Sequence, residues 1–212
     1  MARILITSGP TRQYLDPVRY LTNASSGRMG GALAAAAIEL GHQVVIVSGP
    51  VDITYPAEAT VRPVVSTEEM FDVARAEFSE CDGLIGAAAP CDYRPARVEP
   101  SKINKTGNPL LLHLTETNDV VAALGSEKKA GQWLVGFALE TEDHRLRALA
   151  KLERKSCDLM VSNGIEAMHS LNNRVEIIDA SGVVLRSLEG PKEDVARGIL
   201  AIIQQRLIDG KG

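Results

Sequence analysis

A stretch rich in glycine and serine follows the first apolar run of the chain, Ile4–Thr7. Glycine lets a backbone approach an anion closely, and the N-terminus of a helix attracts phosphate through its free N–H groups. Ser25 or Ser26 can also cap the alanine-rich helical pattern that follows. The stretch predicts a phosphate- or substrate-binding loop, although small residues packed between a helix and a sheet would give the same pattern. The candidate loop residues are Gly9, Ser25, Ser26, Gly27, Arg28 and Gly30.

A second run of small residues stands at the end of a predicted buried strand. Gly86, Ala87 and Ala88 leave room for a planar ligand beside the backbone, and Asp92 offers an acceptor to ribose hydroxyls or a base amine. Tight contact between sheet and helix is the alternative explanation. No histidine lies near Cys91 in the sequence, so we do not expect that thiol to be a nucleophile.

Three cations share one face of a predicted helix over residues 142–156. Arg147, Lys151 and Lys155 recur every four residues. No acidic residue precedes Lys151 or Lys155 by four positions, so the usual intrahelical ion pairs are missing. Cations without partners suit a triphosphate, whereas a solvated charged face is the commoner meaning of such a stripe.

The dinucleotide fingerprint G-x-G-x-x-G is absent, because the glycines stand at Gly27, Gly30 and Gly31. The second predicted strand also ends in Val47-Ser48-Gly49, where a ribose-binding carboxylate would be expected. Both observations argue against an NAD(P)-dependent Rossmann-type oxidoreductase, which stays the alternative enzyme. A nucleotide-binding module without catalysis is a third possibility.

Short apolar runs alternate with helical patterns along most of the chain. This order is typical of a doubly wound, mostly parallel α/β sheet of the Rossmann-like kind, with both faces covered by helices. The expected strands are Ile4–Thr7, Val44–Ser48, Val61–Ser66, Gly83–Ala88, Trp133–Leu139 and Asp158–Ser162. The expected helices cover residues 28–41, 67–80, 118–130 and 142–156, and a capping box at Ser66-Thr67-Glu68-Glu69 supports the second of them.

The last third of the chain changes character. Two apolar runs, Arg174–Ala180 and Val183–Leu188, flank the turn signal Ser181-Gly182 and predict an antiparallel hairpin. Pro191 then opens a final helix. No linker or repeat divides the chain, so we expect one domain over residues 1–212.

A long, proline-containing connection at about residues 94–117 predicts a protruding flap. The turn signal Thr106-Gly107-Asn108-Pro109 lies between Lys102–Lys105 and Leu110–Leu114, which predicts two paired strands with Lys102 at their base.

Composition excludes several classes of protein. The formal net charge of −4 disfavours broad nucleic-acid binding, and no apolar run is long enough to span a bilayer. No signal peptide precedes the first strand, so we expect a cytoplasmic protein. The three cysteines and four histidines lack the spacing of a disulfide framework or a zinc site.

Several motifs occur in the order and spacing of one enzyme family. They are Gly9-Pro10-Thr11, Asp16-Pro17-Val18-Arg19-Tyr20, Asn23, Ser25-Ser26-Gly27-Arg28-Met29-Gly30, Asp92-Tyr93, Lys102-Ile103, Gly136-Phe137-Ala138, Glu140-Thr141, Lys151 and Lys155. Over residues 3–190 the chain resembles the phosphopantothenate–cysteine ligases, the phosphopantothenoylcysteine synthetases of coenzyme A biosynthesis, in their bacterial CTP-dependent form.

The resemblance implies roles for individual residues. Asn23 and Arg19 would lie near the activated acyl group, and Lys102 would serve turnover of the intermediate. The nucleotide-binding residues would be Gly86, Ala87, Ala88, Asp92, Lys102, Asn118, Asp119, Val120, Val121, Phe137, Lys151 and Lys155. The chain departs from the family at Asn118, often a proline there but a good helix cap, and at Pro90-Cys91, where small aliphatic residues are usual.

The resemblance also implies the reaction. The carboxylate of 4′-phosphopantothenate attacks CTP, which gives an acyl-cytidylate and pyrophosphate, and L-cysteine then displaces CMP to form an amide. Mg²⁺ is expected with the CTP, at ligands that the sequence does not identify. No flavin is expected, because nothing in the chain corresponds to the flavin-dependent decarboxylase that is often fused to this domain. The flap implies a homodimer.

Overall fold

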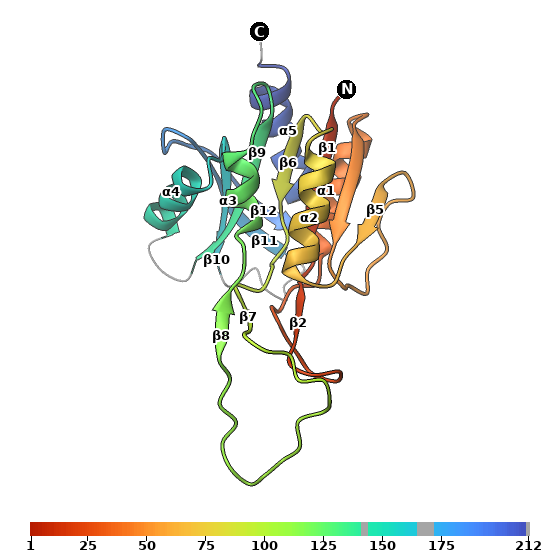
Figure 1. The fold of residues 1–212 in the computed structure, drawn as a ribbon. Helices are drawn as coiled ribbons and strands as arrows, with labels where there is room; N and C mark the ends of the chain where they lie inside the picture. The colour runs from red at the N-terminus through yellow and green to blue at the C-terminus, as the bar shows by residue number, and fades with distance from the viewer. Residues whose placement is uncertain (141–143, 165–171, 211–212) are drawn as a thin grey trace.

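The computed structural model describes residues 1–140, 144–164 and 172–210. Thr141, the first two residues of the predicted helix 142–156 and the C-terminal residues 211–212 lie outside this part. The central sheet has the strand order β5-β4-β1-β6-β9-β10-β11-β12 (Figure 1). Its strands are β1 (Arg3–Ser8), β4 (Gln43–Ser48), β5 (Thr60–Pro63), β6 (Gly83–Gly86), β9 (Trp133–Glu140), β10 (Leu159–Gly164), β11 (Asn172–Asp179) and β12 (Val184–Pro191).

Neighbouring strands from β5 to β10 are parallel, and β11 and β12 are antiparallel to their neighbours. The predicted doubly wound sheet with a C-terminal hairpin is therefore confirmed. From β1 the chain builds outward through β4 to β5, and it then returns to place β6 on the other side of β1. In such sheets ligands bind outside the carboxyl ends of the strands at this reversal point.

Helices cover both faces of the sheet. On one face lie α1 (Arg28–Glu39) and α5 (Lys192–Ile203), followed by a π-helical turn, η2 (Gln204–Ile208). The other face is covered by α2 (Thr67–Phe78), α3 (Val120–Ser126) and α4 (His144–Arg154). In the described part of the chain, the two faces of the sheet are thus packed against helices, whereas the ends of the parallel strands are not.

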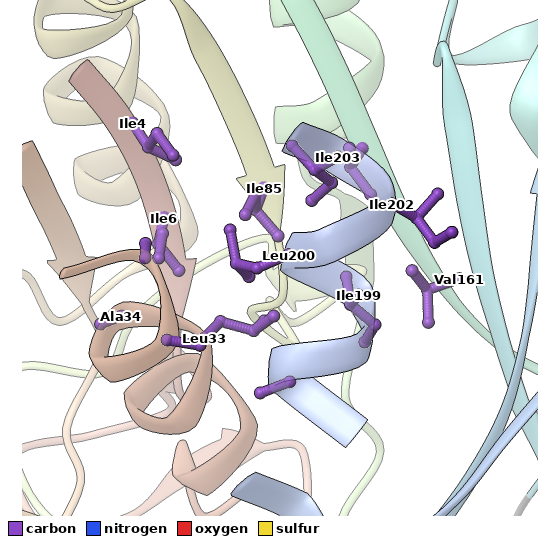
Figure 2. Packing of buried hydrophobic residues seen from close by; sticks show 14 of the residues in the cluster. Ile4, Ile6, Leu33, Ala34, Ile85, Val161, Ile199, Leu200, Ile202 and Ile203 are labelled. Atoms are coloured by element: carbon purple, nitrogen blue, oxygen red, sulfur yellow. The ribbon is translucent and has the colours of Figure 1, made fainter. Parts of the chain in front are cut away.

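The alternation of side chains along the strands explains the two layers. Ile4 and Ile6 of β1 are completely buried against α1 and α5, whereas Leu5 between them is buried in the opposite cluster. Figure 2 shows the first cluster, where Leu33 of α1 and Leu200 of α5 meet above the strands. Full burial of each such side chain stabilises the fold by about 1.5–3 kcal/mol.

Element boundaries follow local chemistry. The capping box before α2 is confirmed, because the Ser66 side chain accepts from the Glu69 N–H and the Glu69 carboxylate accepts from the Ser66 N–H. The third helix is shorter than predicted and ends at Ser126, shortly before Gly131, whose φ of 87° is left-handed. Pro191 is the N-cap of α5, as its position predicts.

Two small hairpins stand at the carboxyl edge of the sheet. One, which the sequence did not reveal, pairs β2 (Arg12–Tyr14) with β3 (Tyr20–Thr22). The other pairs β7 (Tyr93–Pro95) with β8 (Leu114–Glu116) at the base of the flap. The predicted strands at 102–105 and 110–114 are wrong, because pairing is confined to the base and residues 96–113 form an extended loop beyond the sheet (Figure 1).

Among the described helices, none combines the length and the apolar character that crossing a membrane requires.

Candidate functional site

The loop before α1 ends in a tight turn. Gly27 is the N-cap of α1, with a left-handed φ of 73°, and no side chain caps the helix. The expectation that Ser25 or Ser26 caps it is therefore wrong, since the Ser25 hydroxyl accepts only from the Gly27 N–H, at 3.4 Å. Glycine adopts this conformation without the strain that a side chain would bring.

Gly30 allows α1 to pack closely against β1. A Cβ atom at Gly30 would lie 2.1 Å from the Ser8 hydroxyl. That hydroxyl donates to the Gly27 carbonyl at 3.2 Å and accepts from the Tyr55 hydroxyl at 2.9 Å. The packing explanation thus holds for Gly30, and the same contact fixes the N-terminus of α1 at the end of β1.

A cavity of about 430 Å³ opens in front of this loop. It is lined by Pro10, Arg12, Tyr20, Thr22, Asn23, Ala24, Ser25, Ser26, Arg28, Pro50, Val51, Asp52 and Ile53. Asn23, Ser25, Ser26 and Arg28 of the predicted site meet here. Neither Lys102 nor Lys155 is among the lining residues, so the cavity holds one part of the predicted site.

Arg12 is a cavity residue that the sequence did not single out, and Tyr20 was part of a motif without a role assigned to it. The Arg12 guanidinium carbon lies 4.6 Å from the centre of the Tyr20 ring, and the Tyr14 and Tyr20 rings meet edge to face with their centres 5.3 Å apart. In the described part of the chain, the Arg12 guanidinium makes no hydrogen bond and no ion pair. Stacking holds it in place while its donors stay available. The only sequence signal for Arg12 was its place directly after Gly9-Pro10-Thr11. The strands β2 and β3, of three residues each, are too short to show a periodic pattern.

Asn23 joins the two small-residue stretches. Its amide nitrogen donates to the carbonyl of Ala89 at 3.3 Å and to that of Pro90 at 2.8 Å. Beside it the Ala89 N–H donates to the Gly9 carbonyl at 2.9 Å, and Pro10 bridges to Ala89. Since both partners of the Asn23 amide are carbonyls, the nitrogen faces them and Oδ1 points elsewhere. The loops after β1, β3 and β6 thus form one continuous wall.

Cys91 is structural. Its N–H donates to the Thr11 hydroxyl at 2.8 Å, and its carbonyl accepts from the hydroxyls of Thr67 and Thr117. Burial raises the pKa of the Cys91 thiol above its usual value. The same cause raises the pKa of Cys81 to about 11 and that of Cys157 to about 12, and all three thiols are buried. Burial and a raised thiol pKa argue against a nucleophilic role for any of the three.

Two of the predicted nucleotide-binding residues, Asp119 and Lys155, meet where the start of α3 faces the end of α4. Asp119 is the N-cap of α3, in place of Asn118, and accepts from the Ala122 N–H at 3.1 Å. Its carboxylate also pairs with Lys155 at 3.1 Å and with Arg154 at 3.3 Å. Lys155 therefore has a counter-ion, and the interpretation that it lacks one is wrong. The partner lies 36 positions earlier in the chain, outside the reach of a spacing rule for one helix.

The remaining residues of this group lie on neighbouring elements. A Cβ at Gly86 would lie 2.6 Å from Val121, which packs the start of α3 against the end of β6. Ala87 and Ala88 are half-buried and Asp92 is exposed. Val120 is buried, Phe137 is half-buried on β9, and Lys151 is half-buried on α4.

Lys102 stands on the flap, exposed and without a hydrogen bond or ion pair in the described part of the chain. Next to it, the backbone of Ile103 binds Asp16 and Arg19. Asp16 is completely buried. Burial raises the pKa of its carboxyl, but hydrogen bonds from the Arg19 side chain and from backbone N–H groups outweigh that effect and hold the pKa well below its ordinary value.

The described residues contain no group of three or more histidine, cysteine, aspartate or glutamate side chains that could hold a metal ion. Mg²⁺ commonly binds through substrate phosphates and only one or two carboxylates. A magnesium ion that arrived bound to a nucleotide would not need such a group of protein ligands.

Comparison with known proteins agrees with the motifs. Residues 1–207 match the family model described as DNA/pantothenate metabolism flavoprotein C-terminal domain, DFP. The chain is 40% identical over 185 residues to the coenzyme A biosynthesis bifunctional protein CoaBC of Vibrio vulnificus strain CMCP6, which covers 84% of this chain and 46% of that protein. It is also 39% identical over 210 residues to a protein named cysteine/cysteine sulfinic acid decarboxylase, from an unknown prokaryotic organism. That match covers 95% of this chain and 58% of the relative.

The chain spans about half the length of these curated relatives. A crystal structure of the C-terminal domain of CoaBC matches the fold with a TM-score of 0.81 and 37% identity, over 98% of this chain and 96% of that one. These matches do not favour an oxidoreductase.

Proposed function

Because the chain belongs to the family of C-terminal domains of DNA/pantothenate metabolism flavoproteins, we propose that it is a phosphopantothenate–cysteine ligase of coenzyme A biosynthesis. In this proposal it joins 4′-phosphopantothenate to L-cysteine at the expense of CTP. The observation that carries the proposal is the set of hydrogen bonds from Asn23 to the carbonyls of Ala89 and Pro90. These bonds hold the predicted phosphate-binding loop before α1 beside the segment that follows β6.

The proposed chemistry has two steps. A carboxylate oxygen of 4′-phosphopantothenate attacks the α-phosphorus of CTP, and the bond to the bridging oxygen breaks to release pyrophosphate. The amine of cysteine then attacks the acyl carbon, CMP leaves with the anhydride oxygen, and the nitrogen loses a proton to give the amide. Activation is needed because a carboxylate is a poor acyl donor. Both steps develop charge on oxygen, which favours fixed cations and amide donors.

Asn23 is suited to the second step. Its amide nitrogen is occupied by the carbonyls of Ala89 and Pro90, which leaves Oδ1 of this exposed residue as an acceptor for a ligand. An acceptor there would orient an N–H of the incoming amine toward the acyl carbon. The rate would increase because the bound amine is already oriented toward the acyl carbon, which makes the step effectively unimolecular.

The junction of α3 and α4 is suited to the nucleotide. Lys155 is mostly buried and Arg154 exposed, and both stand beside Asp119 at the start of α3. A cation held by a carboxylate keeps its place before the ligand arrives, and it can share its remaining donors with phosphate oxygens. Mg²⁺ bound to the triphosphate would offset part of its negative charge.

The reaction class can be tested by leaving out cysteine. The protein is incubated with 4′-phosphopantothenate, Mg²⁺ and either CTP or ATP, and pyrophosphate and an acyl-nucleotide are sought by mass spectrometry. We expect both products with CTP, and amide and CMP once cysteine is added. Release of carbon dioxide from cysteine without nucleotide use would favour a decarboxylase instead, and a nucleotide that binds without pyrophosphate release would indicate a binding module.

Arg12→Ala should weaken the binding of an anionic substrate. A hydrogen bond to a charged group contributes about 1.5–3 kcal/mol, so we expect the KM for CTP or for 4′-phosphopantothenate to rise about tenfold or more. Measuring the two constants separately identifies which phosphate enters the cavity. Arg174→Ala, an exposed arginine of β11, is the matched control. Unchanged constants for both substrates would remove Arg12 from the site.

We also propose that the protein is a homodimer in which the flaps contact the partner. Leu111 and Leu110 of the flap are 85% and 55% exposed, and Val18 of the neighbouring hairpin is 59% exposed. Exposed apolar side chains gathered on a protruding loop are typical of an interaction surface. Sedimentation should give twice the mass of the chain, and Leu111→Glu should shift it toward the monomer. Leu40→Glu, at the far end of α1, should not.

A further inference from the structure

The flap is attached to the body of the protein at few points. Its strands β7 and β8 pair over only three residues each. Beyond them the Ala96 N–H donates to the His113 carbonyl, and the Glu99 N–H donates to the Leu15 carbonyl, both at 2.9 Å. Lys102 lies further out still. Lys102 comes three residues after Glu99 in the chain. The position of Lys102 therefore depends on the contacts that hold the next residue, Ile103.

Ile103 is held at both of its backbone groups. Its N–H donates to Oδ2 of Asp16 at 3.1 Å, and its carbonyl accepts from the Arg19 guanidinium at 2.6 Å. The Arg19 Nε donates to the same Asp16 oxygen at 3.0 Å, and a second guanidinium nitrogen does so too. We call Asp16, Arg19 and the Ile103 backbone the clasp.

The inner end of the clasp is rigid. Oδ1 of Asp16 accepts from the N–H groups of Val18 at 2.8 Å and Arg19 at 2.9 Å. Both carboxylate oxygens are therefore engaged, and the carboxyl group is completely buried. Charge-assisted hydrogen bonds of this kind are the strongest in proteins, and a buried carboxylate needs all of them to offset its lost hydration.

We propose that Asp16 is a positioning residue, which fixes the backbone beside Lys102 by holding Ile103 through this clasp and so sets where the Lys102 side chain starts. Arg19 keeps two N–H groups without a described partner, because only Nε and one terminal nitrogen take part in the clasp. It can therefore contact substrate and hold the flap at the same time. The role of Lys102 in catalysis rests on the proposed function, whereas the clasp itself does not.

The first experiment measures the flap without any reaction. Trypsin cuts after lysine, so cleavage after Lys102 and Lys105 reports how often the flap leaves the body. In Asp16→Asn an amide NH₂ group replaces one carboxylate oxygen and so faces N–H donors that it cannot accept from. Because the loss of one charged hydrogen bond corresponds to about a tenfold change in an equilibrium constant, we expect cleavage at both sites to be about tenfold faster. The matched control is Asp179→Asn, since Asp179 also accepts from two backbone N–H groups, in the turn between β11 and β12.

The second experiment is a double-mutant cycle on turnover. If Asp16 acts through Lys102, Asp16→Asn lowers kcat about tenfold in the wild-type background and changes it little in Lys102→Gln. A general structural defect would lower kcat by the same factor in both backgrounds, and that result would overturn the proposal. The KM for CTP should change less than kcat, because none of the α3 and α4 residues proposed to hold the nucleotide takes part in the clasp.

The outcomes are separable. Equal trypsin cleavage in Asp16→Asn and wild type overturns the clasp whatever the enzyme does. Faster cleavage in a protein without ligase activity leaves the clasp in place and refutes the proposed function. Should Asp16→Asn fail to fold, Arg19→Lys takes its place, because it keeps the charge and the three backbone donors to Asp16 but loses the planar fork that reaches Ile103. Wild-type cleavage in that variant would also contradict the proposal.

Discussion

Replacing Lys102 by glutamine should lower the turnover of the proposed ligase reaction by roughly 10²–10³, the usual loss for one charge-stabilising donor. Lys102 is exposed and makes no described contact within the protein, so its ammonium group is available to the ligand. Binding of CTP should survive in part, because the α3 and α4 residues are untouched. The checks are kcat from amide formation and the Kd for CTP by calorimetry.

Lys105→Gln is the matched control, because it removes an identical charge from the same exposed loop. It should leave kcat near the wild-type value. Equal losses in both variants would mean that the overall charge of the flap matters and that Lys102 has no particular place. Wild-type turnover in Lys102→Gln would remove the assigned role altogether.

Asn23→Ala should impair the chemistry while the fold is retained. The change removes the acceptor proposed for the amine and both hydrogen bonds to the 89–90 segment. Misplacement by about 1 Å at a reacting centre can cost roughly 10²-fold in rate. We expect a loss of that size in amide formation and a smaller one in pyrophosphate release, so that acyl-nucleotide accumulates. Quenched-flow sampling of both products measures the difference.

The melting temperature of Asn23→Ala distinguishes a role of Asn23 in the chemistry from a role in holding the fold. Each lost hydrogen bond contributes about 0.5–1.5 kcal/mol, so the melting temperature of Asn23→Ala should fall by only a few degrees. Asn108→Ala, an exposed amide at the tip of the flap, serves as the control. Unfolding of Asn23→Ala at ordinary temperature would show that the asparagine is structural.

The sequence predicts the central sheet well because buried parallel strands are continuous apolar runs. Ile4–Thr7 and Val44–Ser48 lie inside β1 and β4, and the turn at Ser181-Gly182 marks the final hairpin. Helix ends were less predictable. The sequence offers Ser25 and Ser26 as N-caps of α1, whereas the N-cap in the structure is Gly27 with a left-handed φ.

Features that depend on distant partners could not be read in advance. The ion pair of Lys155 with Asp119 joins two helices, and the contact of Asp16 with Ile103 joins a hairpin to the flap. The apolar run Leu110–Leu114 has the composition of a strand, but most of it finds no neighbouring strand to pair with. Of the site, the wall around Asn23 could be anticipated as separate motifs, whereas the hydrogen bonds that assemble it could not.

The burial of Cys81, Cys91 and Cys157 has a consequence for a protein that would handle free cysteine. Cystine, the oxidised form of that amino acid, reacts with thiolates by disulfide exchange and would leave a half-cystine attached to any accessible sulfur. Desolvation raises the pKa of these three thiols, so they stay protonated at neutral pH, and their burial leaves little sulfur surface for disulfide exchange. A ligase of the proposed kind could therefore work in a pool of cysteine and cystine without having its own thiols capped.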